Sequence, residues 1–171
     1  MNSSILDSSE YNKYYQPYIS ILDEQDLFIS LEEGKLIFLD LLKSISVTKL
    51  DYAYEEGKWS IAEILLHLID SERIFQYRAL RFARNDTTPV PGFEQDDYIP
   101  NSRANTRDKE SIANEFIAVR TSTIALFNSF NAEELARVGL ASNSEMSVRA
   151  LGFVICGHLL HHRKIIMERY L

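Results

Sequence analysis

The chain has 171 residues, 46% of them hydrophobic and 25% charged, a balance typical of a globular protein with its own core rather than of a disordered chain. Eighteen Lys and Arg residues against 25 Asp and Glu residues give a formal charge of −7, which disfavours phosphate backbones and anionic lipid surfaces as partners. The basic residues are scattered, and no apolar run approaches the roughly 20 residues that span a bilayer. We therefore expect neither nucleic acid nor a membrane as a partner.

The sequence carries no sign of export. Residues 1–7 lack the basic region of a signal peptide, and Cys156 is the only cysteine, so an internal disulfide is excluded. A single domain over residues 1–171 with a cytoplasmic location is the expectation. Cys156 itself is interpreted as a small buried apolar residue.

Residues 1–25 are expected to form an N-terminal extension that packs on the outside of the fold, because residues 11–18 contain four tyrosines and one proline. The segment Asp26–Ser44 contains no proline and spaces its apolar residues as a helix does, at Leu27, Leu31, Phe38, Leu41 and Leu42. This segment predicts the first long helix.

A second long helix is predicted to begin at Ser60 and to run to about Arg84. Ser60 and Glu63 form a capping box, in which the hydroxyl and the carboxylate each satisfy a backbone N–H that helix geometry leaves free. The apolar positions that follow keep helical spacing: Ile61, Ile64, Leu65, Leu68, Phe75 and Phe82. His67 and Glu72 border this stripe, so both are expected to face the interior.

Residues 85–107 are predicted to be a long loop between helices. The segment contains three prolines and a glycine, and a connection of this length without secondary structure is usually functional or disordered. Phe93 and Tyr98 are candidates to anchor it against the fold, as a lid or as a dimer contact.

Two more helices are predicted after this loop. One begins near Asp108 and ends around Asn131, with apolar residues alternating by four and three, as in the seam of an antiparallel bundle. The last begins at Ser147 as its N-cap and repeats the same step through Leu151, Ile155, His158, His162, Ile165 and Arg169. No strand pattern is long enough to build a sheet. The predicted fold class is all-α, an antiparallel four-helix bundle.

Three histidines occupy core-facing positions on two of these helices. His158 and His162 are four residues apart, so their side chains leave one helix face roughly 6 Å apart and can converge on one ion. His67 would reach the same ion from a neighbouring helix. His161 points about 100° away from His162 and is not expected to join them. The alternative for the His158 and His162 pair is two ordinary histidines bonded to water or to backbone carbonyls.

Three imidazoles and one free coordination position form an open catalytic zinc arrangement, in which the metal activates a water or a thiol. Asp70 and Glu72 are candidates to accept a histidine N–H or to act as a general base. For each of them the alternative is a solvated helix surface or an ion pair with Arg73 or Arg78.

A basic strip, Arg78, Arg81 and Arg84, closes the second helix. Most such strips are solvated and complement the helix dipole. Binding of a substrate carboxylate by Arg78 or Arg81 is the other interpretation. Trp59, directly before the Ser60 cap, is interpreted as a hydrophobic staple.

Short motifs stand in a fixed order along the chain. Residues 58–60 (KWS) precede residues 67–73 (HLIDSER), and residues 157–162 (GHLLHH) follow near the end of the chain. Together with residues 91–96 (PGFEQD) and 168–170 (ERY), they resemble the DinB/YfiT-like superfamily of metalloenzymes, and the resemblance runs from about Glu10 to Leu171. The resemblance implies a four-helix bundle of up-down-down-up topology, commonly dimeric, with nickel or zinc held by His67, His158 and His162.

Members of that superfamily include thiol S-transferases that use bacillithiol or mycothiol, a mycothiol-dependent maleylpyruvate isomerase, and metal-dependent hydrolases. The leading hypothesis is therefore a metal-dependent enzyme with Zn²⁺ or Ni²⁺ at the three histidines, acting on a small molecule as a bacillithiol-like S-transferase, with a low-molecular-weight thiol as co-substrate, or as a related hydrolase. A homodimer is expected. The alternative is a non-catalytic dimeric module in which the metal only joins two helices. An open fourth position favours the enzyme, and a closed four-ligand shell favours the module.

Overall fold

Four long helices form the body of the protein. The computed structural model describes residues 1–171, and the helices are α2 (Leu27–Ser44), α3 (Ile61–Ala83), α5 (Lys109–Asn128) and α7 (Val148–Arg169). Their N-caps are Asp26, Ser60, Asp108 and Ser147, whose side chains accept backbone N–H groups, and the capping box of α3 is present. The all-α bundle and its four helix starts are confirmed. None of the helices combines the length and the apolarity that a membrane span requires.

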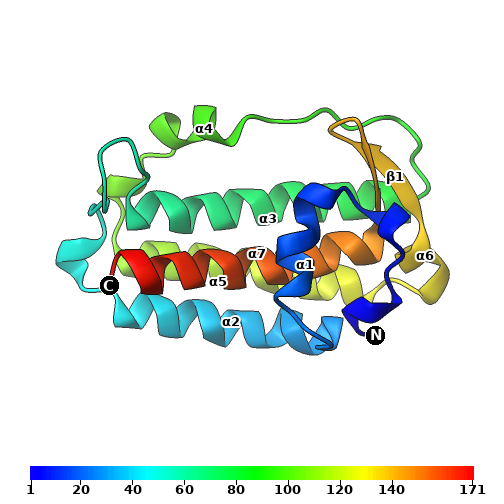
Figure 1. The fold of residues 1–171 in the computed structure, drawn as a ribbon, viewed down its shortest axis with the longest axis horizontal. Coiled ribbons are helices and arrows are strands. Elements are labelled where there is room, and N and C mark those ends of the chain that lie inside the picture. The colour runs from blue at the N-terminus through cyan, green and yellow to red at the C-terminus, as the bar shows by residue number, and fades with distance from the viewer.

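The helices have up-down-down-up topology, because α2 and α7 run in one direction along the bundle while α3 and α5 run in the other (Figure 1). Each of α3 and α2 packs on both α5 and α7. Since α3 and α5 are parallel, the chain between them must return over the length of the bundle. The 23 residues of α3 span about 35 Å, which explains why the connection at residues 85–107 is long.

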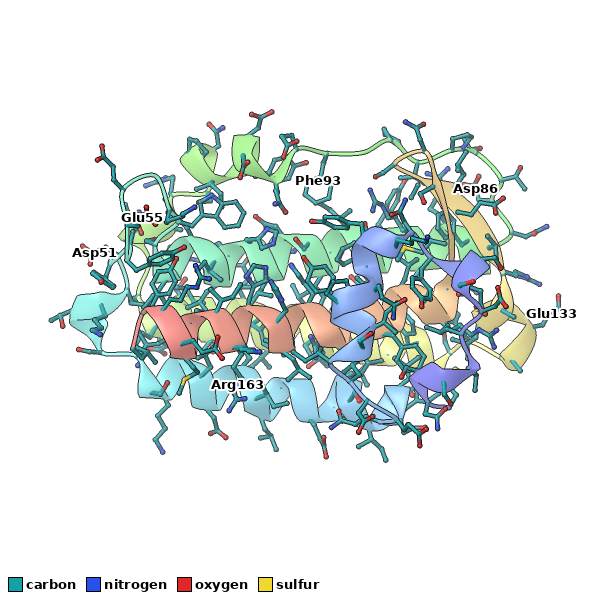
Figure 2. All side chains as sticks on the ribbon, viewed as in Figure 1. Asp51, Glu55, Asp86, Phe93, Glu133 and Arg163 are labelled. Atoms are coloured by element: carbon teal, nitrogen blue, oxygen red, sulfur yellow. The ribbon has the colours of Figure 1, made fainter.

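The returning connection runs along the outer side of α3 and contains the short helix α4 (Gln95–Tyr98) (Figure 1). Val90 fixes its first part to the hairpin described below, since its N–H donates to the Leu140 carbonyl at 2.9 Å and its carbonyl accepts from the Ser142 N–H at 3.0 Å. Of the two predicted anchors, Phe93 is half-buried and directed toward the bundle (Figure 2), whereas Tyr98 is exposed and contacts Phe93.

A small hairpin precedes α7, so the expectation that no strand pattern is long enough to build a sheet was wrong for this segment. After the short helix α6 (Ala132–Ala136), strand β1 (Val138–Ala141) pairs antiparallel with β2 (Ser144–Ser147). The two turn residues, Ser142 and Asn143, both have positive φ, 51° and 59°, as a type I′ turn requires. Each strand has only four residues, too few for alternation to be visible in the sequence.

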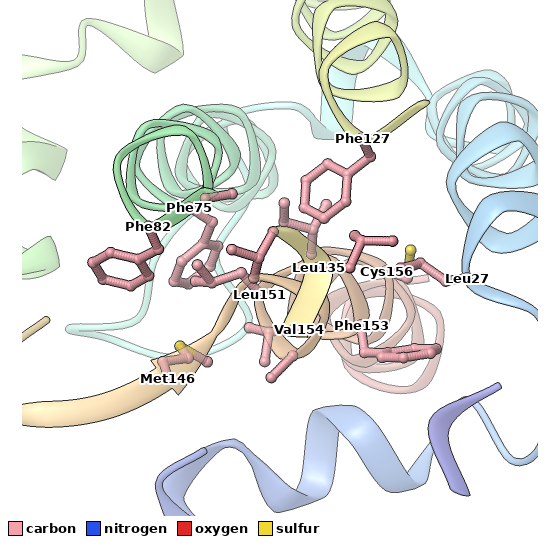
Figure 3. Packing of buried hydrophobic residues seen from close by; sticks show 14 of the residues in the cluster. Leu27, Phe75, Phe82, Phe127, Leu135, Met146, Leu151, Phe153, Val154 and Cys156 are labelled. Atoms are coloured by element: carbon pink, nitrogen blue, oxygen red, sulfur yellow. The ribbon is translucent and has the colours of Figure 1, made fainter. Parts of the chain in front are cut away.

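The core is divided by a layer of buried polar side chains. One apolar cluster surrounds the first half of α7 (Figure 3), and the second fills the opposite end of the bundle. On all four long helices the residues between the two clusters are small or polar: Gly34, Ser71, Glu72, Arg120, Thr123 and His158. The candidate histidine site therefore lies where the apolar core is interrupted.

Arg120 and Glu72 form the centre of this layer. Nε and Nη2 of Arg120 donate to the two carboxylate oxygens of Glu72 at 2.7 and 2.8 Å, and the Thr123 hydroxyl donates to Oε1 of Glu72 at 2.8 Å. Gly34 makes room for the guanidinium, because a Cβ at that position would lie 1.9 Å from Nη1 of Arg120. The buried ion pair is thus fully hydrogen-bonded and shielded from water.

The N-terminal residues pack across the outside of the bundle. Helix α1 (Gln16–Ser20) crosses α7 (Figure 1) and approaches it tightly at Gly157. A Cβ on Gly157 would lie 1.8 Å from the Tyr18 carbonyl oxygen. Glycine at this position therefore lets Tyr18 reach the neighbouring His158.

Candidate metal centre

The structure brings His67 of α3 together with His158 and His162 of α7. One ring nitrogen from each histidine lies within 4.8 Å of the others. The Nε2 atoms of His67 and His158 are 3.0 Å apart, and the ring centroid of His162 lies 4.6 Å from that of His158 and 5.0 Å from that of His67. The three residues predicted from spacing converge because α3 and α7 are direct neighbours in the bundle.

Burial keeps these imidazoles neutral. It lowers the pKa of His67 to about 4 and, together with the neighbouring histidines, the pKa of His162 to about 3. Burial and the other imidazoles also place the pKa of His158 well below its ordinary value. Neutral rings are the form that binds a metal, so the cluster needs no proton release near pH 7.

The donor set fits a divalent metal ion. Nδ1 of His162 is buried without a hydrogen-bond partner, and a buried polar atom without a partner in the protein indicates a missing ligand or water. No Cys, Asp, Glu or fourth His joins the cluster. Three imidazoles without a fourth protein ligand are the donor set of an open site.

Aromatic and hydroxyl side chains surround the three histidines. The Trp59 ring lies 4.9 Å from the His67 ring, and the Ser71 hydroxyl lies 3.4 Å from Nδ1 of His67. The Tyr18 ring lies 5.2 Å from the His158 ring. Ser71 was not predicted as part of the site, although its spacing of four residues from His67 on one helix was a usable signal.

The carboxylates expected to assist the histidines face elsewhere. Glu72 is bound by Arg120 and Thr123, and Asp70 lies 3.6 Å from Arg73, with burial raising the pKa of its carboxyl group. Neither carboxylate hydrogen-bonds to a histidine. Their expected role as a histidine partner or general base therefore has no supporting contact.

His161 and Cys156 lie outside the cluster. His161 is partly exposed and packs its ring 5.0 Å from that of Tyr18. Cys156 is buried, and burial raises the pKa of its thiol to about 12. A thiol with this pKa is neither a nucleophile nor a metal ligand at neutral pH.

A cavity of about 250 Å³ opens beside the histidines. Its wall on α3 is a stripe of one helix face, His67, Ser71, Phe75 and Arg78, and His158 of α7 continues it. The other walls are Tyr14, Tyr15 and Tyr18 from the N-terminal segment, Phe93, Glu94 and Gln95 from the returning connection, and Ser142 from the hairpin turn. A second cavity of about 280 Å³ borders His162 and Trp59. The cluster can therefore be reached by small molecules.

Replacement of Gly157 by alanine is expected to displace α1 and open this cavity. The added methyl group would collide with the Tyr18 backbone rather than with a flexible side chain, and such overpacking costs about 1–3 kcal/mol. Thermal melting and limited proteolysis around residues 16–20 measure the effect. Unchanged melting together with unchanged protection of these residues would contradict the assigned packing.

The metal-free protein is expected to lose stability as the pH falls from 7 to 5. The histidine pKa values of about 4 and 3 in the folded chain lie below the unfolded value of about 6.5, so the unfolded state binds more protons in this range. The contribution of the neutral histidines to the free energy of unfolding is present in full above about pH 6.5. It falls by about 2 kcal/mol per histidine when the pH reaches 5. Urea denaturation in the presence of a chelator at pH 7, 6 and 5 measures the loss, which should be smaller in a His162→Gln variant. A free energy of unfolding that stays constant would refute the prediction.

Comparison with curated protein sequences gives no match. Among solved structures, YfiT from Bacillus subtilis, described as a probable metal-dependent hydrolase with an unusual four-helix bundle topology, is similar with a TM-score of 0.73 and 17% sequence identity, over 83% of this chain and 82% of that chain. The mycothiol-dependent maleylpyruvate isomerase is similar with a TM-score of 0.67 and 9% identity, over 81% of this chain and 58% of that chain. At these identities the likeness shows a shared fold.

The family assignment rests on sequence similarity rather than on the shared fold. The model of the DinB superfamily matches residues 31–166, which hold most of the four long helices and all three histidines of the cluster. The resemblance found in the short motifs is therefore confirmed, and the chain belongs to the DinB superfamily.

Proposed function

We propose that the protein is a metal-dependent enzyme in which His67, His158 and His162 bind one Zn²⁺ or Ni²⁺ ion. The observation that carries the proposal is the set of three neutral imidazoles whose ring nitrogens lie within 4.8 Å of one another without a fourth protein ligand, with His67 and His158 at the wall of a 250 Å³ cavity. Structural zinc sites are closed by four protein ligands, whereas catalytic sites leave a position open for water or substrate.

A divalent ion at this position supplies Lewis acidity and lowers the pKa of a water or a thiol beside it. Side chains of the protein orient the ligands, exclude water and contact the substrate. Ser71 contacts Nδ1 of His67 and orients the ring, and Phe75 and Tyr18 exclude bulk water on the cavity side of His158. The half-buried Phe93 provides an apolar surface for substrate on the opposite wall.

Transfer of a low-molecular-weight, bacillithiol-like thiol to a small electrophile is the reaction we favour. A structural relative is named as mycothiol-dependent, and a cavity of about 250 Å³ opens beside His67 and His158. Hydrolysis is the second candidate, because YfiT is described as a probable metal-dependent hydrolase. Both reactions need the same open site. A metal that merely joins α3 to α7 is the non-catalytic alternative.

Elemental analysis followed by two assays separates these functions. The purified protein is expected to contain about one Zn or Ni per chain. It should then accelerate consumption of a bimane electrophile by bacillithiol, mycothiol or cysteine, or else hydrolyse small esters and amides, with loss on chelation and recovery on adding metal. A protein without metal refutes the proposal. A protein with one firmly bound metal and no turnover in either assay supports the non-catalytic alternative.

We also expect a homodimer and a cytoplasmic location, the first from the resemblance and the second from the composition. Size-exclusion chromatography with light scattering tests the dimer directly.

A further inference from the structure

Arg78 is a buried cation that no carboxylate of the chain neutralises. Its side chain is only 2% exposed, and it takes part in none of the ion pairs of the structure. Nη2 donates to the Ser142 hydroxyl at 2.9 Å and to the Pro91 carbonyl at 3.4 Å, while Nε is buried without a partner. Buried charges are normally paired, so the guanidinium lacks an anion.

The other buried arginine, Arg120, has a structural role and is paired within the chain. Its charge is neutralised by Glu72, which accepts two short hydrogen bonds from the guanidinium, and the Leu31 carbonyl accepts a third. Arg78 has only neutral oxygen acceptors. The contrast indicates that the anion for Arg78 comes from outside the chain.

Arg78 is placed on the same face of α3 as the metal centre. It follows His67 by 11 residues, which is three helical turns and about 20° of rotation. Its guanidinium carbon lies 5.9 Å from the Phe75 ring centroid, and that ring lies 6.2 Å from the His158 ring. A single aromatic ring therefore separates the guanidinium from the histidines, within the reach of one small molecule.

Nearby carboxylates do not compete for this position. Glu94 lines the same cavity, and Glu145 lines a neighbouring cavity of about 170 Å³ that Arg78 also borders, but both side chains are exposed and neither pairs with Arg78. Phe93, whose ring centroid lies 5.9 Å from the guanidinium carbon, closes the opposite side. The remaining space beside Arg78 is bordered by aromatic rings and hydroxyl groups.

We propose that Arg78 binds the carboxylate of a small organic acid, whose apolar part lies between Phe75 and Phe93 and whose far end reaches the histidine cluster. The planar guanidinium offers paired donors that match a carboxylate. This inference names the substrate class of the enzyme proposed above and rests on that function for the reaction, although binding of the acid itself requires no metal.

Calorimetry on the metal-free protein with benzoate and with its neutral analogue benzamide tests the inference. Benzoate is expected to bind at least about tenfold more tightly than benzamide, and saturating benzoate should raise the melting temperature. Arg78→Met should abolish the preference for benzoate and change the melting temperature of the free protein only slightly, because it removes the hydrogen bonds to Ser142 and Pro91 but no ion pair. Arg78→Lys, which keeps the charge but not the paired donors, should retain part of the preference.

Arg81→Met is the matched control, since Arg81 lies three residues further on, pairs with Asp86 and does not border the cavity. It should leave the benzoate preference unchanged. Equal binding of benzoate and benzamide by the wild-type protein overturns the inference, and so does an Arg78→Met variant that still prefers benzoate. If the protein binds one metal per chain but shows no preference for benzoate, only this inference fails. If it prefers benzoate but binds no metal, only the proposed function fails.

Discussion

Replacement of His162 by alanine is expected to reduce bound metal from about one ion per chain to nearly none while the four long helices stay folded. Two imidazoles, His67 and His158, would remain, and two ligands do not hold a divalent ion firmly against water or a chelator. His162 is the least buried of the three ligands, so its removal disturbs the core least. Elemental analysis after dialysis and circular dichroism measure the two outcomes.

His161→Ala provides the matched control, because this residue is adjacent, partly exposed and outside the cluster. It should keep the metal. Retention of a full equivalent of metal by His162→Ala would exclude the three-histidine site. If His162→Ala unfolds the protein, whereas His161→Ala does not, the non-catalytic alternative gains, since bound metal would then be needed for folding.

Replacement of Glu72 by glutamine is expected to destabilise the protein by about 3–5 kcal/mol. The substitution leaves the guanidinium of Arg120, which is fully buried, without a negative partner. A double variant, Glu72→Leu with Arg120→Met, should recover most of this loss, because it removes both buried charges. Chemical denaturation of the two variants and of wild type measures the difference.

The exposed pair between Lys164 and Glu168, 3.9 Å apart, supplies the control for Glu72. Glu168→Gln should change the free energy of unfolding by less than about 1 kcal/mol. Equal stability of Glu72→Gln and wild type would contradict the role assigned to the buried pair. If Glu72→Gln were as stable as wild type but lost metal or activity, the result would support the direct role at the histidines that the sequence indicated for Glu72.

The helix starts and the histidine trio were predictable because both depend on local chemistry. A capping residue acts within three positions of itself, as Ser60 and Glu63 do, and a pair spaced by four residues shares a helix face in any context. To predict that His67 converges with this pair, it is enough to expect that core-facing positions of neighbouring helices meet.

The partners of the buried arginines could not be predicted in the same way. Glu72 and Arg120 are 48 residues apart, and Arg78 meets Ser142 across 64 residues, so no spacing rule connects them. In sequence, Arg78 belongs to a strip that looks solvated. Its burial depends on the hairpin turn and on where the returning connection packs. Four-residue strands leave too weak a pattern to reveal the hairpin, and the predicted loop at residues 85–107 does not show which surface it will cover.

The clustered histidines and much of the cavity wall beside them come from different parts of the chain, and the returning connection between α3 and α5 supplies only wall. The histidines sit on α3 and α7, inside the bundle, whereas much of the cavity wall comes from the N-terminal segment, the connection and the hairpin turn, all outside the four long helices. Substitutions or insertions in these outer segments would reshape the space offered to a substrate without moving the ligands. The architecture can thus change its selectivity while its histidine cluster stays constant.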